Sequence, residues 1–257
     1  MPVGAAGRQH AAGLSLRNTM ADILQVQGLT KSFGAIQVAS DVHFNVAEGE
    51  ILGVIGPNGA GKTTLFGMLS GHIPSSAGKV IFRGDDITAL VTHDRARLGI
   101  ARTFQVPRPF GQMTVFDNLR VAATFAGGMQ GVEATDWIER TLATTGLTRH
   151  ADTLAGRLPL LVRKRHELAR ALAARPKLLL IDEVAAGLTE SEVSEFIDLV
   201  RRIRNMGTTV VWIEHVIRTM LTATDRLMAL AGGNVLAIGI PHEVINLPEV
   251  KRVYLGV

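Results

Sequence analysis

The sequence predicts an α/β fold with a mainly parallel sheet core, an N-terminal antiparallel β subdomain and an inserted helical subdomain. Three observations predict it. Short apolar runs without alternation, typical of strands buried on both faces, occur at Ile51–Ile55, Leu178–Ile181 and Thr208–Ile213. Each run precedes or follows a segment of helix length, as parallel strands require. Residues 106–157, between the first two runs, carry no strand pattern.

The composition allows one domain, or one domain with a subdomain, because the chain has 257 residues and 47% of them are apolar. The 27 basic and 23 acidic residues give a net charge of +4, without a basic run that would indicate a nucleic-acid-binding arm. We expect the densest basic cluster, Arg163–Arg165, to be a solvated helix face. The chain contains no cysteine, which excludes disulfides and thiolate metal sites.

Two boundaries follow from composition. Residues 1–19 are rich in Gly and Ala, contain no acidic residue and lack the apolar stretch of a secretory signal. We therefore predict a disordered extension at 1–21 and one folded domain at 22–257, with the helical subdomain at about 106–165. No apolar run reaches the ~18–20 residues that span a bilayer, so any role at a membrane is expected to depend on partner proteins.

The N-terminal subdomain is predicted from three short strands. They are Ile23–Leu29, Asp41–Val46 and Lys79–Phe82. In the second strand, apolar and polar residues alternate, the period of a half-buried strand. The residues after the third strand, Arg83–Asp86, are expected to form a turn.

The remaining elements are helices and one hairpin. Asn118–Phe125 and Thr135–Thr144 are helical in composition, and Arg163–Leu172 continues a helical apolar face that includes Leu161. Arg226–Leu230, the turn Gly232-Gly233-Asn234 and Val235–Ile238 predict a terminal hairpin.

A glycine-rich segment follows the predicted strand Ile51–Ile55. It satisfies the pattern G-x4-G-K-[ST] and is followed by a helix expected to begin at Thr63, the context that a phosphate-binding loop requires. Glycines let successive N–H groups turn inward around an anion, and the helix adds the positive end of its dipole. Lys62 would bridge the terminal phosphates, and the Thr63 hydroxyl would ligate Mg²⁺. The predicted nucleotide-binding residues of this segment are Gly56, Pro57, Asn58, Gly59, Ala60, Gly61, Lys62, Thr63 and Thr64.

Two acids end another predicted strand. Asp182 and Glu183 directly follow Leu178–Ile181, and ligands of open α/β sheets bind beyond the carboxyl ends of strands. We expect Asp182 to hold Mg²⁺ through its water shell. Glu183 faces another direction and would polarise the attacking water. Beside a phosphate loop, the pair predicts a catalytic site.

In their order along the chain, these motifs resemble those of ABC-transporter nucleotide-binding subunits. The order is Phe33, the loop Gly56–Thr63, Gln105, the segment Leu158–Val162, Asp182–Glu183 and His215. The resemblance covers nearly the whole chain from about residue 22 and is closest to the ATP-binding subunits of branched-chain amino acid importers. That closer resemblance is carried by Ala101–Gln105, by Asp182–Leu188, and by the tail at Gly239–Val244 and Val253–Gly256.

The resemblance implies a P-loop NTPase of the ABC cassette type that hydrolyses ATP with Mg²⁺. It also implies roles for three further residues. Phe33 would stack on the adenine. Gln105 would contact Mg²⁺ and the attacking water, and His215 would contact the γ-phosphate. The predicted catalytic residues are therefore Glu183, His215 and Gln105, and the predicted metal ligands are Thr63, Gln105 and Asp182.

One motif of the family is altered in this chain. The family's signature turn is Leu-Ser-Gly-Gly-Gln or a near variant, and it caps the γ-phosphate of an ATP held by the other subunit of a head-to-tail dimer. Here Leu158–Val162 reads Leu-Pro-Leu-Leu-Val. Pro159 has neither N–H nor hydroxyl but suits a helix start, and Leu160 and Leu161 add bulk where backbone should approach phosphate. We predict a heterodimer with one competent and one impaired site, whereas a homodimer would have two weakened sites.

The resemblance implies a subunit that powers an importer of branched-chain or related amino acids, peripheral at the cytoplasmic face of the cell membrane. Expected partners are a second ABC ATPase subunit, membrane permeases docking near Val106–Leu119, and indirectly an extracytoplasmic substrate-binding protein; no nucleic acid is expected. Three alternatives stay open: the ATPase of a lipid or polysaccharide exporter, a non-transport ABC protein acting in DNA repair or on the ribosome, and a regulatory cassette with little turnover. Intact Glu183 and His215 disfavour the last.

Overall fold

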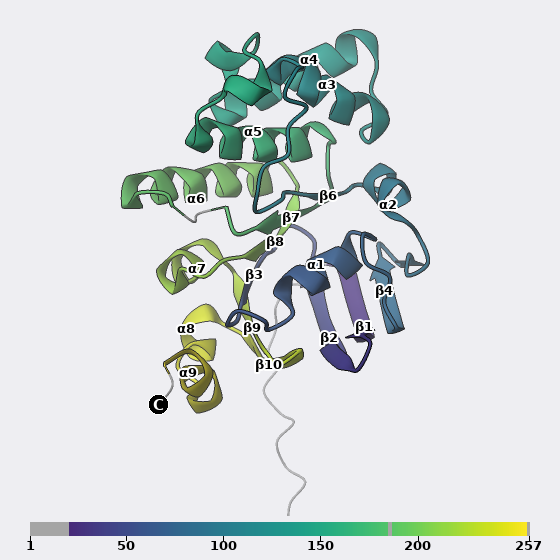
Figure 1. Ribbon diagram of the computed structural model, residues 1–257, viewed down its shortest axis with the longest axis vertical. Coiled ribbons are helices and arrows are strands. Elements are labelled where there is room, and N and C mark those ends of the chain that lie inside the picture. The colour runs from purple at the N-terminus through teal and green to yellow at the C-terminus, as the bar shows by residue number, and fades with distance from the viewer. Residues whose placement is uncertain (1–20, 185–186, 256–257) are drawn as a thin grey trace, which may run out of the picture.

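The computed structural model describes residues 21–184 and 187–255 (Figure 1). The predicted disordered extension lies outside these residues except for Ala21. Ala185, Ala186 and Gly256, which belong to the stretches that carry the family resemblance, also lie outside them.

The predicted antiparallel N-terminal subdomain is confirmed. Its strand order is β2-β1-β4-β5, and each neighbouring pair is antiparallel. The strands are β1 (Asp22–Phe33), β2 (Ile36–Ala47), β4 (Ala77–Phe82) and β5 (Asp85–Asp86). Asp85 and Asp86, expected in a turn, instead pair with the end of β4.

The mainly parallel core is also confirmed. Within the described residues, the second sheet has the order β10-β9-β3-β8-β7-β6, with β10 antiparallel to β9 and the other neighbours parallel. Its strands are β3 (Ile51–Ile55), β6 (Ile100–Arg102), β7 (Leu178–Asp182), β8 (Thr209–Ile213), β9 (Arg226–Ala231) and β10 (Asn234–Gly239). The sequence did not predict β6, because three residues are too few to show a strand period.

Helices join the two sheets and cover the outer face of the parallel one. They are α1 (Lys62–Leu69), α2 (Thr92–Leu98), α3 (Val115–Phe125), α4 (Gly131–Thr145), α5 (Leu160–Ala173), α6 (Glu190–Asn205), α7 (Ile217–Ala223), α8 (Pro241–Val244) and α9 (Pro248–Leu255). Helix α1 lies between the sheets, where Phe66 and Leu69 share an apolar cluster with Leu24 of β1 and Val54 of β3 (Figure 1). In the described ranges, no helix is both long and apolar enough to cross a bilayer.

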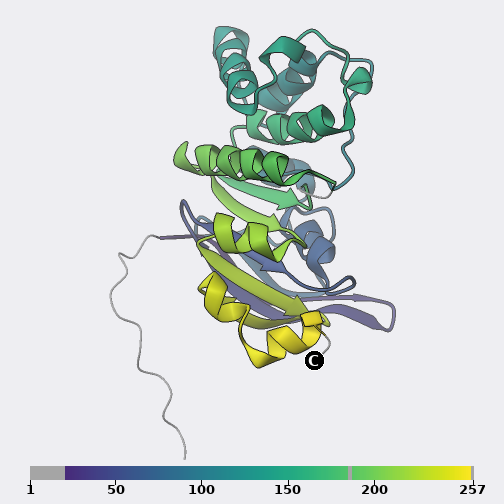
Figure 2. The same ribbon diagram turned by 90° about the vertical axis from the view of Figure 1, so that its left-hand side faces the viewer.

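The outer face of the parallel sheet, opposite α1, packs against α5, α6, α7 and the C-terminal helices (Figure 2). Phe196 of α6 meets Trp212 of β8 edge to face, with ring centroids 5.6 Å apart. Val244 and Val250 of the C-terminal helices are buried in the same cluster. The first part of the tail that resembles amino acid importers, Gly239–Val244, therefore packs against the folded core through Val244.

The helical subdomain is built from α3, α4 and α5 around its own apolar cluster, which includes Leu119, Ile138 and Leu158. Helix α5 belongs to both parts of the molecule. Its Ala169 and Ala173 pack in the subdomain, whereas Leu168 and Leu172 pack against the parallel sheet. The helix passes through the boundary expected at about residue 165 without a break.

The prediction of a solvated helix face at Arg163–Arg165 is wrong. Lys164 is buried, and its ammonium donates a hydrogen bond to the Val184 carbonyl oxygen at 3.0 Å. Arg163 donates to the Leu158 carbonyl oxygen at 3.0 Å, and Arg165 pairs with Glu195. Because α5 is packed on two sides, Lys164 is directed into the protein, and Arg163 and Arg165 are only half-buried instead of fully solvated.

His166 of α5 should make the fold sensitive to acid. The ring is fully buried, and neither nitrogen has a hydrogen-bond partner among the described residues. Burial, assisted by the charge of Arg170, lowers the pKa of His166 to about 4. In the unfolded chain its pKa is about 6.5, so the unfolded state binds the extra proton first. Stability is thus fully present above pH ~6.5 and is lost as the pH falls toward about 4, by up to about 3 kcal/mol.

We therefore expect His166→Leu to remove this part of the pH dependence and to raise the free energy of unfolding more at about pH 5 than at about pH 7.5. The measurement is urea unfolding at about pH 5 and pH 7.5. His242→Leu, at an exposed histidine, is the matched control and should leave the pH dependence unchanged. A wild-type profile that is flat between these pH values would contradict the assignment.

Candidate functional site

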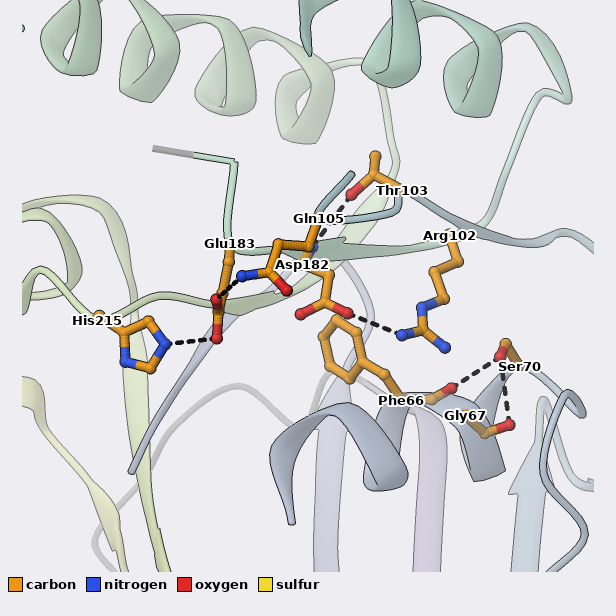
Figure 3. Close-up of polar contacts among 9 residues, drawn as sticks. All are labelled: Phe66, Gly67, Ser70, Arg102, Thr103, Gln105, Asp182, Glu183 and His215. Atoms are coloured by element: carbon orange, nitrogen blue, oxygen red, sulfur yellow. Dashed lines mark hydrogen bonds and ion pairs between the residues drawn. The ribbon is translucent and has the colours of Figure 1, made fainter. Parts of the chain in front are cut away.

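The site lies where four parallel strands end. Because β3, β6, β7 and β8 run in the same direction, their carboxyl ends meet at one edge of the sheet. This edge brings together the phosphate loop after β3, Gln105 after β6, the acids Asp182 and Glu183 at β7, and His215 after β8 (Figure 3). Residues up to 159 positions apart in sequence thereby come into one site.

Two glycines of the phosphate loop lie too close to neighbouring backbone for any side chain. A Cβ on Gly61 would lie 2.3 Å from the Val38 carbonyl oxygen, and a Cβ on Gly56 would lie 2.5 Å from the Leu230 carbonyl oxygen. Gly61 also has φ 98°, in the left-handed region that favours glycine. The loop is thus held between β2 and β9 just before α1 begins at Lys62.

The loop encloses a cavity of about 320 Å³. The lining residues are Val38, Asn58, Gly59, Ala60, Gly61, Lys62, Thr63, Thr64, Gln105 and Glu183. Most of the predicted nucleotide-binding residues therefore face one space. Gly56 and Pro57 take part through their carbonyl oxygens, which accept hydrogen bonds from the Lys62 ammonium at 2.7 and 3.0 Å.

Lys62 is held where a cation would meet the phosphates of a nucleotide. The residue is 5% exposed, and burial lowers its pKa while Glu183 and Asp182 oppose that shift. An ammonium group has three N–H donors, and the two loop carbonyls use two of them. The geometry leaves the third donor for an anion in the cavity.

Two of the predicted catalytic residues, Gln105 and His215, both contact the third, Glu183. The Glu183 carboxylate accepts a hydrogen bond from Gln105 Nε2 at 2.5 Å, and its other oxygen lies 2.5 Å from His215 Nε2 (Figure 3). Glu183 is buried and has φ 46°, a conformation that is rare outside glycine and costs roughly 1–3 kcal/mol. Such strain persists where the surrounding structure enforces it, here partly through a 3.0 Å bond from the Glu183 N–H to the Ile213 carbonyl oxygen.

Asp182 has a different environment from its neighbour Glu183. Its Oδ2 accepts a hydrogen bond from Arg102 at 2.7 Å, and its N–H donates to the Thr103 hydroxyl at 3.1 Å. Burial raises the pKa of Asp182, and the bond and charge of Arg102 counteract the shift. Oδ1 is buried and accepts no hydrogen bond within the described part of the chain.

The donor set fits Mg²⁺. This ion prefers oxygen ligands, keeps several waters and is commonly bound through one or two carboxylates together with substrate phosphates. Thr63 and Gln105 line the cavity, and the unpartnered Asp182 Oδ1 is an acceptor that a metal-bound water would satisfy. These side chains are thus compatible with the predicted metal site.

Phe33 and the altered signature segment lie apart from this cavity's lining. Phe33 ends β1 with half of its surface exposed, and its ring lies 5.0 Å from the Lys31 ammonium. In the signature segment, Pro159 occupies the N-cap position of α5 without a side-chain capping bond, as its helix-start role predicted. Leu158 is buried, but Leu160 is 66% exposed at the tip of the helix.

Arg102 and Thr103 were missed as site residues, although they belong to the stretch Ala101–Gln105 that carries the family resemblance. The available signal was a charged residue three positions before Gln105. This signal could not be interpreted from the sequence, because the role of Arg102 depends on β6, a strand that the sequence did not predict. Strand β6 places Arg102 beside β7, which ends at Asp182.

Comparisons with known proteins identify the family of this chain. A family model described as ABC transporter matches residues 39–186. The lipopolysaccharide export system ATP-binding protein LptB of Haemophilus influenzae is 36% identical over 91% of this chain and 97% of that protein. The high-affinity branched-chain amino acid transport ATP-binding protein LivG of Salmonella typhimurium is 37% identical over 91% of this chain and 98% of that protein. The crystal structure of the ADP conformation of MJ1267, an ATP-binding cassette of an ABC transporter, has a TM-score of 0.84 and 29% identity, covering 92% of this chain and 100% of that one.

Proposed function

The chain belongs to the ABC transporter family as an ATP-binding subunit, and from this premise we propose that it hydrolyses ATP to power an importer of branched-chain or related amino acids. Subunits of this family bind ATP with Mg²⁺ and work with membrane permeases. The observation that carries ATP hydrolysis in this proposal is the contact of Gln105 and His215 with Glu183 at the phosphate-loop cavity.

Each residue has a defined task on ATP in this proposal. The loop N–H groups and the Lys62 ammonium bind the β- and γ-phosphates. Glu183 accepts a hydrogen bond from the attacking water, orients it and takes up its proton as the general base. His215 exchanges its contact with Glu183 for the γ-phosphate, and Gln105 stays beside the water. Mg²⁺ on Thr63, Asp182 and Gln105 would neutralise the charge that develops on the phosphate oxygens.

We also propose that the altered signature makes one site of a mixed dimer weak. Leu160 exposes an apolar side chain where the family presents small residues to a partner's ATP. A lost charge-assisted phosphate contact costs roughly 1.5–3 kcal/mol, or about one to two decades in affinity or rate. This chain's own Lys62, Asp182, Glu183 and His215 would form the competent site with a normal signature from a second subunit.

The impaired signature can be tested on this chain in the absence of a second subunit. Restoring the family turn with Pro159→Ser, Leu160→Gly, Leu161→Gly and Val162→Gln should raise ATP hydrolysis by the homodimer about 10- to 100-fold. Phosphate release at steady state measures it. The same four substitutions combined with Lys62→Ala should give no gain, which excludes a contaminating ATPase. Equal turnover at both sites of a mixed dimer, measured in a single turnover, would count against an impaired site.

A second cavity marks the proposed permease-docking surface. It has a volume of about 470 Å³ and lies between β6, α3 and α5, with Phe104, Phe110 and Val121 in its lining. Phe110 is half exposed, and its backbone is fixed by two hydrogen bonds with Asn118, at 2.9 and 3.1 Å. Because Phe104 and Phe110 flank Gln105 in the chain, a permease bound there would sense changes at the catalytic residues.

An exporter is the second candidate, because LptB and LivG are about equally similar to this chain. The tail at Gly239–Val244 supports the importer, since its resemblance is to amino acid importers and α8 and α9 pack it into the core.

The test uses the complex with permeases encoded by neighbouring reading frames, in liposomes. We expect a binding protein loaded with branched-chain amino acid to stimulate ATP hydrolysis. Stimulation by lipopolysaccharide instead would support the exporter, and binding of ATP without turnover would support a regulatory cassette.

A further inference from the structure

Arg102 makes a contact that the reaction outlined above does not use. Its guanidinium donates from Nη2 to Asp182 Oδ2 at 2.7 Å, and both side chains are less than 10% exposed (Figure 3). The contact joins neighbouring strands, because Arg102 ends β6 and Asp182 ends β7. The positive charge is thus fixed to the carboxylate that is expected to serve the metal.

The surroundings of the guanidinium are apolar. Its central carbon lies 5.7 Å from the centroid of the Phe66 ring and 5.4 Å from that of Phe104. Arg102 Nε is buried and has no hydrogen-bond partner among the described residues. Aromatic faces attract a cation but do not replace a hydrogen bond, so the carboxylate of Asp182 is its principal polar contact. In such surroundings water screens the pair weakly, and each charge depends on the other.

The two carboxylate oxygens of Asp182 therefore have different surroundings. Figure 3 shows one oxygen directed at Arg102 and the other directed away from it. The second oxygen, Oδ1, is the one that accepts no hydrogen bond within the described chain. Arg102 thus holds the carboxylate in one rotamer and leaves one acceptor for another ligand.

We propose that Arg102 is the resident counter-cation of Asp182: it neutralises and orients this carboxylate while no metal is bound, and it weakens the attraction of Asp182 for Mg²⁺ when nucleotide brings the metal. The inference rests on the proposed function, because it takes the metal site from there. Its physical basis is that one carboxylate in a poorly screened site serves two cations, which repel each other. Arg102 is a positioning residue that makes metal binding reversible and dependent on nucleotide.

The first test measures stability without metal. Arg102→Met keeps the side-chain length and removes the charge, leaving Asp182 buried without its partner. We expect the melting temperature to fall by roughly 5–15 °C. The double variant Arg102→Met/Asp182→Asn should recover most of that loss, because it removes the orphaned charge as well. The cycle is completed by the single variant Asp182→Asn. If the losses of melting temperature in the two single variants add up in the double variant, Arg102 acts by packing between the rings and the proposal is wrong.

The second test measures the metal directly. At saturating ADP, the thermal stability of each protein is titrated with Mg²⁺, and the midpoint concentration is read. Arg102→Met should lower the midpoint by about tenfold, because a nearby positive charge is gone, whereas Arg102→Lys should stay close to wild type. Arg226→Met is the matched control, because it breaks another ion pair, with Glu50 at 3.2 Å, and should leave the Mg²⁺ midpoint unchanged.

The outcomes separate this inference from the proposed function. If the wild-type protein shows no stabilisation by Mg²⁺ and ADP, the proposed nucleotide site is wrong and the inference is wrong with it. If the wild type responds and Arg102→Met has an unchanged or higher midpoint, the site stands and the inference is wrong. A lower midpoint together with a non-additive cycle supports the inference.

Discussion

Replacing Lys62 with alanine should reduce ATP hydrolysis by at least about 100-fold and should also abolish tight ATP binding. Two losses combine in this variant. The phosphates lose a charged donor in a buried cavity, and the loop loses the bonds from the ammonium to the Gly56 and Pro57 carbonyl oxygens. Because we expect the loop N–H groups to surround the phosphates only while the loop keeps its shape, binding should fall along with the rate.

Two measurements check this expectation: the affinity for a fluorescent ATP analogue with Mg²⁺, and the rate of phosphate release. Lys79→Ala is the matched control, because Lys79 is exposed and pairs with Asp86 far from the loop in sequence. It should behave as wild type. If Lys62→Ala keeps its affinity and rate, the phosphate loop is not the nucleotide site and the proposed function is wrong.

Replacing Glu183 with glutamine should separate binding from hydrolysis. The amide has nearly the shape of the carboxylate and can remain between Gln105 and His215, but it cannot take up a proton from water. We expect hydrolysis to fall about 100- to 10,000-fold, the range typical of a lost general base, while ATP affinity is retained. Since ATP would then remain at the site, the proposed dimer should persist longer in the presence of ATP and Mg²⁺.

Single-turnover phosphate release and gel filtration with ATP measure the two effects. Glu249→Gln changes an exposed acid of α9 and should have no effect on either. Loss of binding in parallel with the rate would contradict the assignment, because it would show that Glu183 supports the loop and not the reaction. A small change in rate would instead point to a substrate-assisted proton transfer.

The parts of the site that form contiguous sequence motifs could be predicted from the sequence, and the isolated residues could not. The phosphate loop was predictable because its glycines, Lys62 and Thr63 are contiguous, and a short anion-binding turn requires this spacing. Asp182 and Glu183 were recognisable as the end of a strand buried on both faces. Gln105 and His215 carry no local pattern, and they were assigned only through the family resemblance.

The sequence by itself determined the layers of this protein. Unbroken apolar runs specify strands buried on both faces, alternation specifies the half-buried strand Asp41–Val46, and glycine spacing specifies the loop. The tertiary structure alone decided which polar groups meet: Arg102 with Asp182, Lys164 with the Val184 carbonyl, and His215 with Glu183. The physical reason is that hydrophobic period is a property of neighbouring residues, whereas a buried ion pair depends on strand order and register, which bring distant residues together.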